Sequence, residues 1–282
     1  MSKVAALHAG LSAVQVLLTA LVLVVLGAGS AGAQAEQVVT LETRPGQSIR
    51  VLVQRPSGRA LGSVVLIAGG HGNLEIAADG SLGWGAGNQL VRTRSLYTVA
   101  GFVAAVPDIA PEFKRPGGAD EGYRSTSGHA RDLGGVIAYL RPEAPPVWLI
   151  GTSRGAMSVA NAAARLSGSE RPDGIVITSG LLMSHRGDSQ SAQTTVRGLN
   201  RIAVPTLLVG HELDQCRFSP VSDAVAFRTL LTGAPRVDVK TLSGGISEGP
   251  PCEARAYHGF NGIDQEVVDL VTAWLKTNTP SR

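Results

Sequence analysis

A serine that could act as a nucleophile lies at the centre of residues 151–155, which read G-T-S-R-G. This is the G-x-S-x-G pattern of a strained strand-to-helix turn that exposes a serine hydroxyl. Residues 147–150 are apolar, as a buried strand requires, and residues 156–160 begin a helical pattern of small side chains. We therefore predict that Ser153 is a nucleophile; the alternative is a glycine-rich turn with an idle serine.

A second match to the same pattern occurs at residues 245–249, centred on Ser247. No helical pattern follows it, and Pro250 and Pro251 prevent a helix from starting there. We interpret Ser247 as a loop residue.

A carboxylate is expected after a later strand, because a serine hydroxyl becomes a good nucleophile only beside a histidine that a carboxylate orients. Residues 206–209 are apolar and predict such a strand, and Asp214 follows it at the usual distance. We predict that Asp214 is the acid. Glu212, two residues earlier, is the substitute candidate.

A histidine base should follow the acid in the chain if the order is that of a nucleophile-elbow enzyme. His258 lies in a loop after the last predicted strand and directly before the final amphipathic helix, so we predict that it is the base. The other two histidines after the serine are His211 and His185. We expect His211 to shape the pocket and His185 to lie at the surface or in an insertion.

Backbone N–H groups must also point at the oxyanion that forms during acyl transfer. One is expected from Arg154, the residue after the nucleophile, whose side chain should point out of the pocket. The second is expected from residues 69–72, a G-G-H-G turn after the apolar run 64–68, with Gly70 or His71 as the donor. The alternative is a glycine-rich turn without a functional donor.

The elements that must position these residues alternate along the chain as apolar strands and helical patterns. Continuous apolar strands between helices predict an α/β fold, with a mainly parallel sheet covered by helices on both faces. Ligands then bind at the carboxyl ends of the strands. Strands are predicted at residues 38–41, 49–54, 64–68, 102–106, 147–150, 175–178, 206–209 and 237–241, and helices at 88–100, 128–140, 154–166, 219–231 and 263–276.

Composition limits the class of protein. The chain has 282 residues, 44% of them hydrophobic, and a net charge of +3, which excludes a disordered chain. Charges are spread without basic runs and aromatic residues make up 4%, so nothing indicates nucleic-acid or sugar binding. We found no repeat and no linker that would divide residues 36–282, which we expect to form one domain.

The N-terminus has the pattern of a secretory signal peptide over residues 1–35. No charged residue lies between Lys3 and Glu36, and the apolar block 16–26 is followed by small residues that suit cleavage after Ala33 or Ala35. The alternative is an uncleaved membrane anchor. Either way the rest of the chain is exported, which predicts a secreted or periplasmic protein, without stable membrane association once the segment is cleaved.

Two cysteines, Cys216 and Cys252, lie in the exported part. Outside the cytosol we expect them to form a disulfide, which a chain-entropy model values at about 4 kcal/mol. Such a bond would tie the loop of Asp214 to the loop of His258, or simply stabilise two loops. The alternative is two free thiols.

Four motifs occur in the same order as in the α/β-hydrolase superfamily: the glycine turn, the G-x-S-x-G turn, the acid after a late strand and the histidine before the last helix. The chain resembles that superfamily over nearly all of residues 45–278. The resemblance implies the α/β-hydrolase fold and a Ser-His-Asp triad made by Ser153, His258 and Asp214. The paired cysteines are similar to those of secreted esterases and cutinase-like enzymes. The glycine turn departs from the H-G-G-G order, because here it reads G-G-H-G.

The residues favour a serine hydrolase that cleaves carboxylic esters through an acyl-enzyme. The alternatives are an acyltransferase or amidase with the same triad, and a non-catalytic binding protein on the same fold. A metal site made by His211, Glu212 and Asp214 is a further alternative.

The expected partner is a small-molecule or polymeric ester, and no cofactor is expected because no phosphate loop or dinucleotide fingerprint occurs. Segments 74–87 and 184–197 are expected to shape the pocket. Trp84, Phe113 and Leu181 are either lining or core residues.

Overall fold

A computed structural model of the chain describes residues 35–120, 122–185 and 190–279. The proposed signal segment therefore lies outside the described residues, except for Ala35. Among the described helices, none is both long and apolar enough to cross a membrane.

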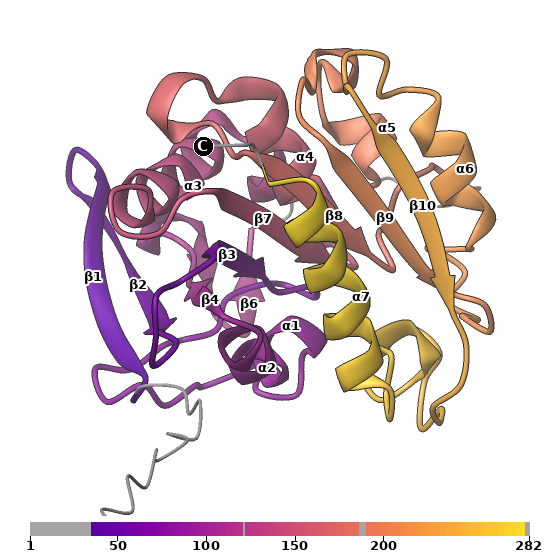
Figure 1. The fold of residues 1–282 in the computed structure, drawn as a ribbon, viewed down its shortest axis with the longest axis horizontal. Coiled ribbons are helices and arrows are strands. Elements are labelled where there is room, and N and C mark those ends of the chain that lie inside the picture. The colour runs from indigo at the N-terminus through magenta and orange to yellow at the C-terminus, as the bar shows by residue number, and fades with distance from the viewer. Residues whose placement is uncertain (1–34, 121, 186–189, 280–282) are drawn as a thin grey trace, which may run out of the picture. The chain divides into compact units, whose positions relative to one another are not determined.

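The core of the fold is an eight-stranded sheet with the order β1-β2-β4-β3-β7-β8-β9-β10, and β1 and β10 form its edges (Figure 1). The pairs β1–β2 and β2–β4 are antiparallel, and every other neighbouring pair is parallel, as the alternation of strands and helices predicts. The strands are β1 (Gln37–Arg44), β2 (Gln47–Gln54), β3 (Gly62–Ile67), β4 (Phe102–Pro107), β7 (Val147–Thr152), β8 (Gly174–Thr178), β9 (Thr206–His211) and β10 (Val237–Leu242).

Helices and short turns connect these strands. The α-helices are α1 (Gln89–Arg92), α2 (Arg94–Val99), α3 (Ser127–Leu140), α4 (Gly155–Arg165), α5 (Ala192–Thr195), α6 (Ser222–Arg228) and α7 (Asp264–Thr277). The 3₁₀ turns are η1 (Pro111–Phe113), η2 (Tyr123–Ser125), η3 (Gly168–Glu170), η4 (Leu199–Arg201) and η5 (Tyr257–Gly259), and β5 (Lys114–Arg115) pairs with β6 (Gly118–Ala119) in a small hairpin.

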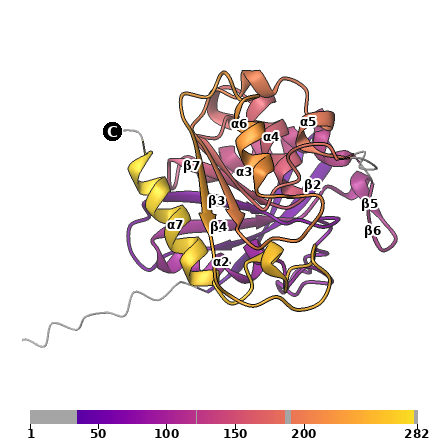
Figure 2. The same cartoon turned by 90° about the vertical axis from the view of Figure 1, so that its right-hand side faces the viewer.

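Both faces of the sheet are covered, which explains why its central strands are apolar throughout. In β7, Val147 and Leu149 point into the core beneath α3, α4 and α6, whereas Trp148 and Ile150 point into the core beneath α2 and α7. Figure 2 shows these two layers of helices on opposite sides of the sheet. The carboxyl ends of the central parallel strands consequently meet at one edge, where the loops that follow them lie together.

Two predicted helices are wrong in extent. Residues 88–100 form two short helices, α1 and α2, that meet at Thr93, whose hydroxyl donates to the Gln89 carbonyl oxygen at 2.7 Å. The helix expected over 219–231 spans only α6, because residues 216–221 form the turns of the loop that carries Ser219.

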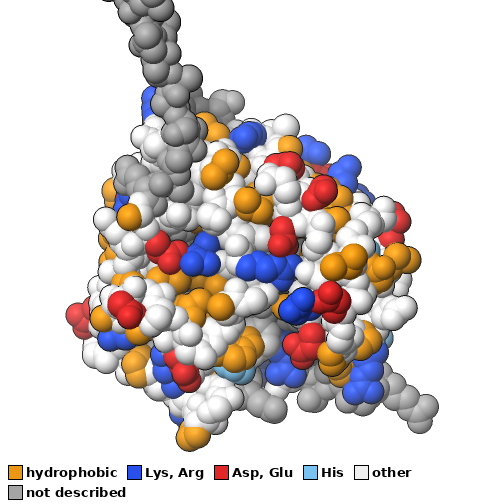
Figure 3. Space-filling view, turned by 90° about the horizontal axis from the view of Figure 1, so that it is seen from below, with side chains coloured by type: hydrophobic (Ala, Val, Ile, Leu, Met, Phe, Trp, Pro, Cys, Tyr) orange, Lys and Arg blue, Asp and Glu red, His pale blue; other side chains and the backbone are white. Residues whose placement is uncertain are grey.

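The face seen from below in Figure 3 carries acidic and basic side chains interspersed with hydrophobic ones. No wide area of one sign is visible on that face. The small net charge of +3 is thus not concentrated into a basic surface on that side of the molecule.

Candidate active site

Ser153 lies in a tight turn between the end of β7 and the start of α4. Its φ angle is +54°, in the left-handed region that side chains other than glycine rarely adopt. The backbone there is held by a hydrogen bond from the Ser153 N–H to the Thr178 carbonyl oxygen at 3.0 Å. This is the geometry that the G-x-S-x-G pattern describes, with the serine raised at the tip of a strained turn.

Close packing explains why glycines flank this turn. A Cβ atom on Gly151 would lie 2.5 Å from the Gly155 carbonyl oxygen, and one on Gly155 would lie 2.6 Å from the Ile67 carbonyl oxygen. Neither site has room for a side chain, so α4 starts directly against the end of β3. That contact brings Ser153 beside the loop that follows β3.

The turn of residues 69–72 touches Ser153. A Cβ on Gly69 would lie 2.9 Å from the Ser153 Cβ, and Gly70 has a φ of +54° with the Trp84 ring packed over it. Gly70, His71 and Arg154 line the same cavity as Ser153. Their three N–H groups have no hydrogen-bond partner among the described residues, so each is available to a ligand.

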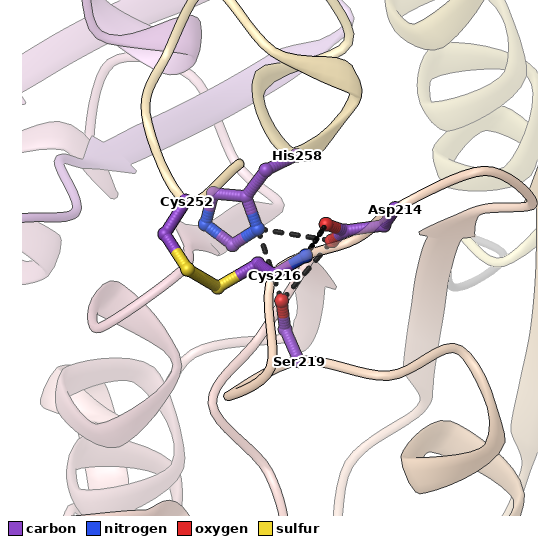
Figure 4. The surroundings of a disulfide bond; sticks show 5 residues. All are labelled: Asp214, Cys216, Ser219, Cys252 and His258. Carbon is purple, nitrogen blue, oxygen red and sulfur yellow. Dashed lines mark hydrogen bonds and ion pairs between the residues drawn. A yellow bond between two sulfur atoms is a disulfide. The ribbon is translucent and has the colours of Figure 1, made fainter. Parts of the chain in front are cut away.

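Asp214 and His258 are in direct contact, although 44 residues separate them in sequence. His258 Nδ1 lies 2.9 Å from Asp214 Oδ2, and both side chains are almost fully buried. Asp214 follows β9, and His258 lies in η5 before α7, so the two loops meet beyond the ends of the strands (Figure 4). An ionised carboxylate only accepts hydrogen bonds, so His258 donates to it from Nδ1, and in the neutral imidazole Nε2 is then the acceptor.

The Nε2 atom of His258 is buried and has no hydrogen-bond partner in the part of the chain that the structure describes. His258 and Ser153 line one cavity of about 660 Å³, but no hydrogen bond joins these two side chains within the described ranges. Hydrogen bonds of catalytic residues are often long before substrate binds. The arrangement places a base and a hydroxyl at the same cavity.

Ser219 is a functional candidate that sequence reasoning missed. Its hydroxyl lies 3.0 Å from Asp214 Oδ2 and 3.0 Å from His258 Nδ1, and it is buried with them (Figure 4). The Cys216 N–H donates to Asp214 Oδ1 at 2.8 Å. Three donors therefore converge on one carboxylate. No motif marks Ser219; the only signal is its position five residues after the acid.

The disulfide between Cys216 and Cys252 is present, and it closes a separation of 36 residues. It joins the loop of Asp214 to the segment that leads into His258, and both cysteines line the cavity (Figure 4). The bond therefore links the two loops on which the Asp214–His258 contact depends.

The remaining candidates occupy other places. His211 is fully buried, donates from Nε2 to the Gly244 carbonyl oxygen at 2.9 Å and stacks on Tyr257, so it supports the pocket floor rather than entering it. Glu212 is exposed and accepts only from Thr241 Oγ1, at 3.4 Å. His185 pairs with Asp223 at 2.7 Å. Within residues 35–279, apart from the gaps, no cluster of three His, Cys, Asp or Glu residues suits a metal ion.

The cavity walls are partly aromatic. Trp84 stacks on His71 with ring centroids 3.8 Å apart, and Leu181 and Phe218 add apolar surface. Phe113 does not line the cavity; it is packed in the core against Tyr123 at 5.6 Å. Part of the segment 184–197 lies outside the described residues.

Comparisons with known proteins agree with this architecture. No family model and no curated protein matches the sequence. Among solved structures, a dienelactone hydrolase from Anabaena variabilis is 16% identical with a TM-score of 0.58, over 87% of this chain and 99% of its own. An alpha-beta serine hydrolase homologue from Coxiella burnetii is 17% identical with a TM-score of 0.57, over 86% and 97%.

A thermostable carboxylesterase from a metagenomic library is also similar, at 17% identity and a TM-score of 0.55, over 89% of this chain and 91% of its own. The structural neighbours are thus α/β serine hydrolases and esterases over most of the chain, and the fold is the α/β-hydrolase fold.

Replacing Ser219 with alanine should lower kcat roughly tenfold, because the Asp214 carboxylate loses one of its charge-assisted hydrogen bonds. KM should stay close to the wild-type value, since Ser219 does not line the cavity. Steady-state hydrolysis of a short-chain aryl ester measures both. The matched control is Ser247→Ala, which removes an exposed loop hydroxyl and should leave kcat unchanged. Equal kcat values for the two variants would contradict this role.

Reduction of the Cys216–Cys252 bond should lower the melting temperature and the hydrolytic activity together. The chain-entropy model gives about 4 kcal/mol for a loop of this length. Differential scanning fluorimetry and ester hydrolysis, with and without reductant, measure both effects once thiol titration confirms reduction. The double variant Cys216→Ala/Cys252→Ala controls for the reductant itself and should not respond to it. An unchanged melting temperature in fully reduced wild type would refute the expectation.

Proposed function

We propose that the chain is an exported serine hydrolase that cleaves carboxylic esters, with Ser153 as nucleophile, His258 as base and Asp214 as the acid that orients it. One observation carries the proposal. His258 is held by Asp214 through Nδ1, while its unpartnered Nε2 belongs to the cavity that Ser153 enters from a strained turn. The likeness to esterases and hydrolases supports the same class of reaction.

The reaction begins when Ser153 Oγ attacks the ester carbonyl carbon and its proton passes to His258 Nε2. The carbonyl π electrons move to oxygen, and the resulting oxyanion accepts hydrogen bonds from the N–H of Arg154 and from that of Gly70 or His71. The imidazolium that forms lies against the Asp214 carboxylate, which stabilises its positive charge.

Collapse of the tetrahedral intermediate breaks the bond to the alkoxy oxygen, which leaves as an alcohol with the proton from His258 Nε2. The acyl group remains on Ser153. A water molecule then attacks this ester while His258 takes its proton, and the second tetrahedral intermediate releases the carboxylic acid as Ser153 Oγ recovers its proton. No redox step and no cofactor is needed for the balance.

Hydrolysis should depend on Ser153 and His258. With a chromogenic short-chain aryl ester, wild type should release the phenol, either in a burst or at a steady rate. Ser153→Ala should abolish this release. His258→Ala should reduce kcat/KM by about four orders of magnitude while the fold is retained. His185→Ala is the matched control, because His185 lies outside the cavity lining. Ser153-independent turnover would contradict the proposal.

The choice of acid can be tested by two amide substitutions. Asp214→Asn should lower kcat by about four orders of magnitude, because an amide cannot stabilise the imidazolium and favours the wrong tautomer. Glu212→Gln should change kcat by less than about twofold, since Glu212 is exposed and does not contact His258. Hydrolysis rates and melting temperatures of both variants measure the ranking. A reversed ranking would assign the acid to Glu212.

A further inference from the structure

Arg124 is a buried cation without a carboxylate partner. It lies in η2, directly before α3, and only 4% of its surface is exposed. No ion pair to it exists in the described part of the chain. Burial lowers the pKa of its guanidinium. Burying a cation costs free energy unless its donors have hydrogen-bond partners. The partners of Arg124 therefore indicate its role.

Those hydrogen bonds go to the turn that faces the nucleophile. Arg124 Nη2 lies 2.9 Å from the carbonyl oxygen of Ala68, 3.2 Å from that of Gly69 and 3.2 Å from that of Gly70. The neighbouring Tyr123 hydroxyl donates to the His71 carbonyl oxygen at 3.2 Å. Two consecutive side chains thus hold four consecutive carbonyl oxygens.

Because a peptide group is planar, fixing these carbonyl oxygens also fixes the direction of the N–H groups in the same peptides. The Gly69 carbonyl and the Gly70 N–H belong to one planar peptide group, and so do the Gly70 carbonyl and the His71 N–H. In a trans peptide the oxygen and the hydrogen point to opposite sides. Gly70 and His71 line both the 660 Å³ cavity and a small hollow, whereas Arg124 lines only the hollow. The N–H groups that lie opposite the carbonyl oxygens bound by Arg124 are therefore directed away from its guanidinium.

We propose that Arg124 is a positioning residue that aims the Gly70 and His71 N–H groups at the oxyanion, which rests on the proposed esterase function. The N–H groups are free for that task, since neither has a partner among the described residues. A cation at the oxygen end of a peptide also polarises it and strengthens the N–H as a donor. Its positive charge, which has no carboxylate partner among the described residues, favours the negative charge that forms at the turn.

One further hydrogen bond holds the guanidinium in place, and a second holds the hydroxyl that accepts it. Arg124 Nη1 donates to Ser158 Oγ at 2.9 Å, and Ser158 Oγ lies 2.9 Å from His129 Nε2. The Ser158 hydroxyl accepts from Arg124 and is therefore shared between the guanidinium and the His129 ring. Burial and the nearby Arg124 lower the pKa of His129 to about 3.

The packing of Tyr123 and Arg124 explains why the third glycine of the G-G-H-G turn, Gly72, is a glycine. Gly72 has a φ of +77°, and a Cβ atom on it would overlap both the Tyr123 hydroxyl and Arg124 Nη2. Glycine at this position lets the two side chains reach the carbonyl oxygens beneath the turn. The turn and Arg124 therefore depend on each other sterically as well as through hydrogen bonds.

The test compares kcat and KM of Arg124→Gln and Arg124→Lys with wild type on a short-chain aryl ester. We expect Arg124→Gln to lower kcat about 100-fold with KM nearly unchanged, because the oxyanion donors act only in the transition state. Arg124→Lys keeps the charge but loses the fork, and should lower kcat about tenfold. Inhibition by an aryl boronic acid, which forms a tetrahedral adduct on serine, should weaken in parallel with kcat.

The matched control is Arg141→Gln. Arg141 also donates to backbone carbonyl oxygens, those of Ser169 and Arg171, but it does so beside Val147, at the amino end of β7. Its substitution should leave kcat and boronate inhibition unchanged. A loss of kcat in Arg141→Gln equal to that in Arg124→Gln would show a general effect on folding and overturn the proposal.

The two proposals fail in different ways. Wild type without Ser153-dependent hydrolysis would reject the esterase function itself. Ser153-dependent hydrolysis with an unchanged kcat in folded Arg124→Gln would reject only the role of Arg124. If Arg124→Gln does not fold, Arg124→Lys decides: a folded lysine variant with wild-type kcat and wild-type boronate inhibition overturns the proposal, and a selective loss of both supports it.

Discussion

The close contact between the start of α4 and the end of β3 is the constraint on which the site depends. Gly155 packs against the Ile67 carbonyl oxygen and Gly151 against Gly155, and the intervening turn has Ser153 in the left-handed region. The same contact presses the turn against Gly69. The strained backbone at Ser153 and its proximity to the 69–72 turn therefore both result from the packing of α4 on β3. The hydrophobic cores on the two faces of the sheet stabilise this packing.

Two buried charges lie behind the groups that would do chemistry. The Asp214 carboxylate lies behind His258, where positive charge would form, and the Arg124 guanidinium lies behind the 69–72 turn, where negative charge would form. Each charge acts through an intermediary, an imidazole in one case and two peptide groups in the other. Both charges are held by hydrogen bonds in the absence of a ligand, which is the preorganisation that stabilises charge in a transition state.

Local sequence patterns were sufficient to predict the fold and which residues lie in the loops at the strand ends. Residues 147–155 combine an apolar strand, a glycine-flanked serine and a small-residue helix, and each part constrains the others. Ser219 and Arg124 could not be found in this way, because they contact His258 and Gly70, which lie 39 and 54 residues away in the sequence. An arginine is ordinarily exposed, so only the tertiary structure reveals one with buried carbonyl partners.

The segment that carries His258 has little regular structure, so its position must be fixed by contacts other than the sheet. The disulfide holds it at Cys252. Arg92 of α1 holds it at two further points, with donors 3.0 Å from the Ala254 carbonyl oxygen and 2.7 Å from that of Gly259, and is itself fixed by Asp264 at 2.8 Å. The His258 imidazole thus lies in a segment that is held by the disulfide at Cys252 and by the Arg92 guanidinium. Backbone hydrogen bonds from Glu248 to the Arg255 carbonyl oxygen and from Ile246 to that of Asn261, each 2.9 Å long, hold the same segment on either side of the imidazole, so its orientation toward Asp214 rests on several contacts that are remote from the sheet.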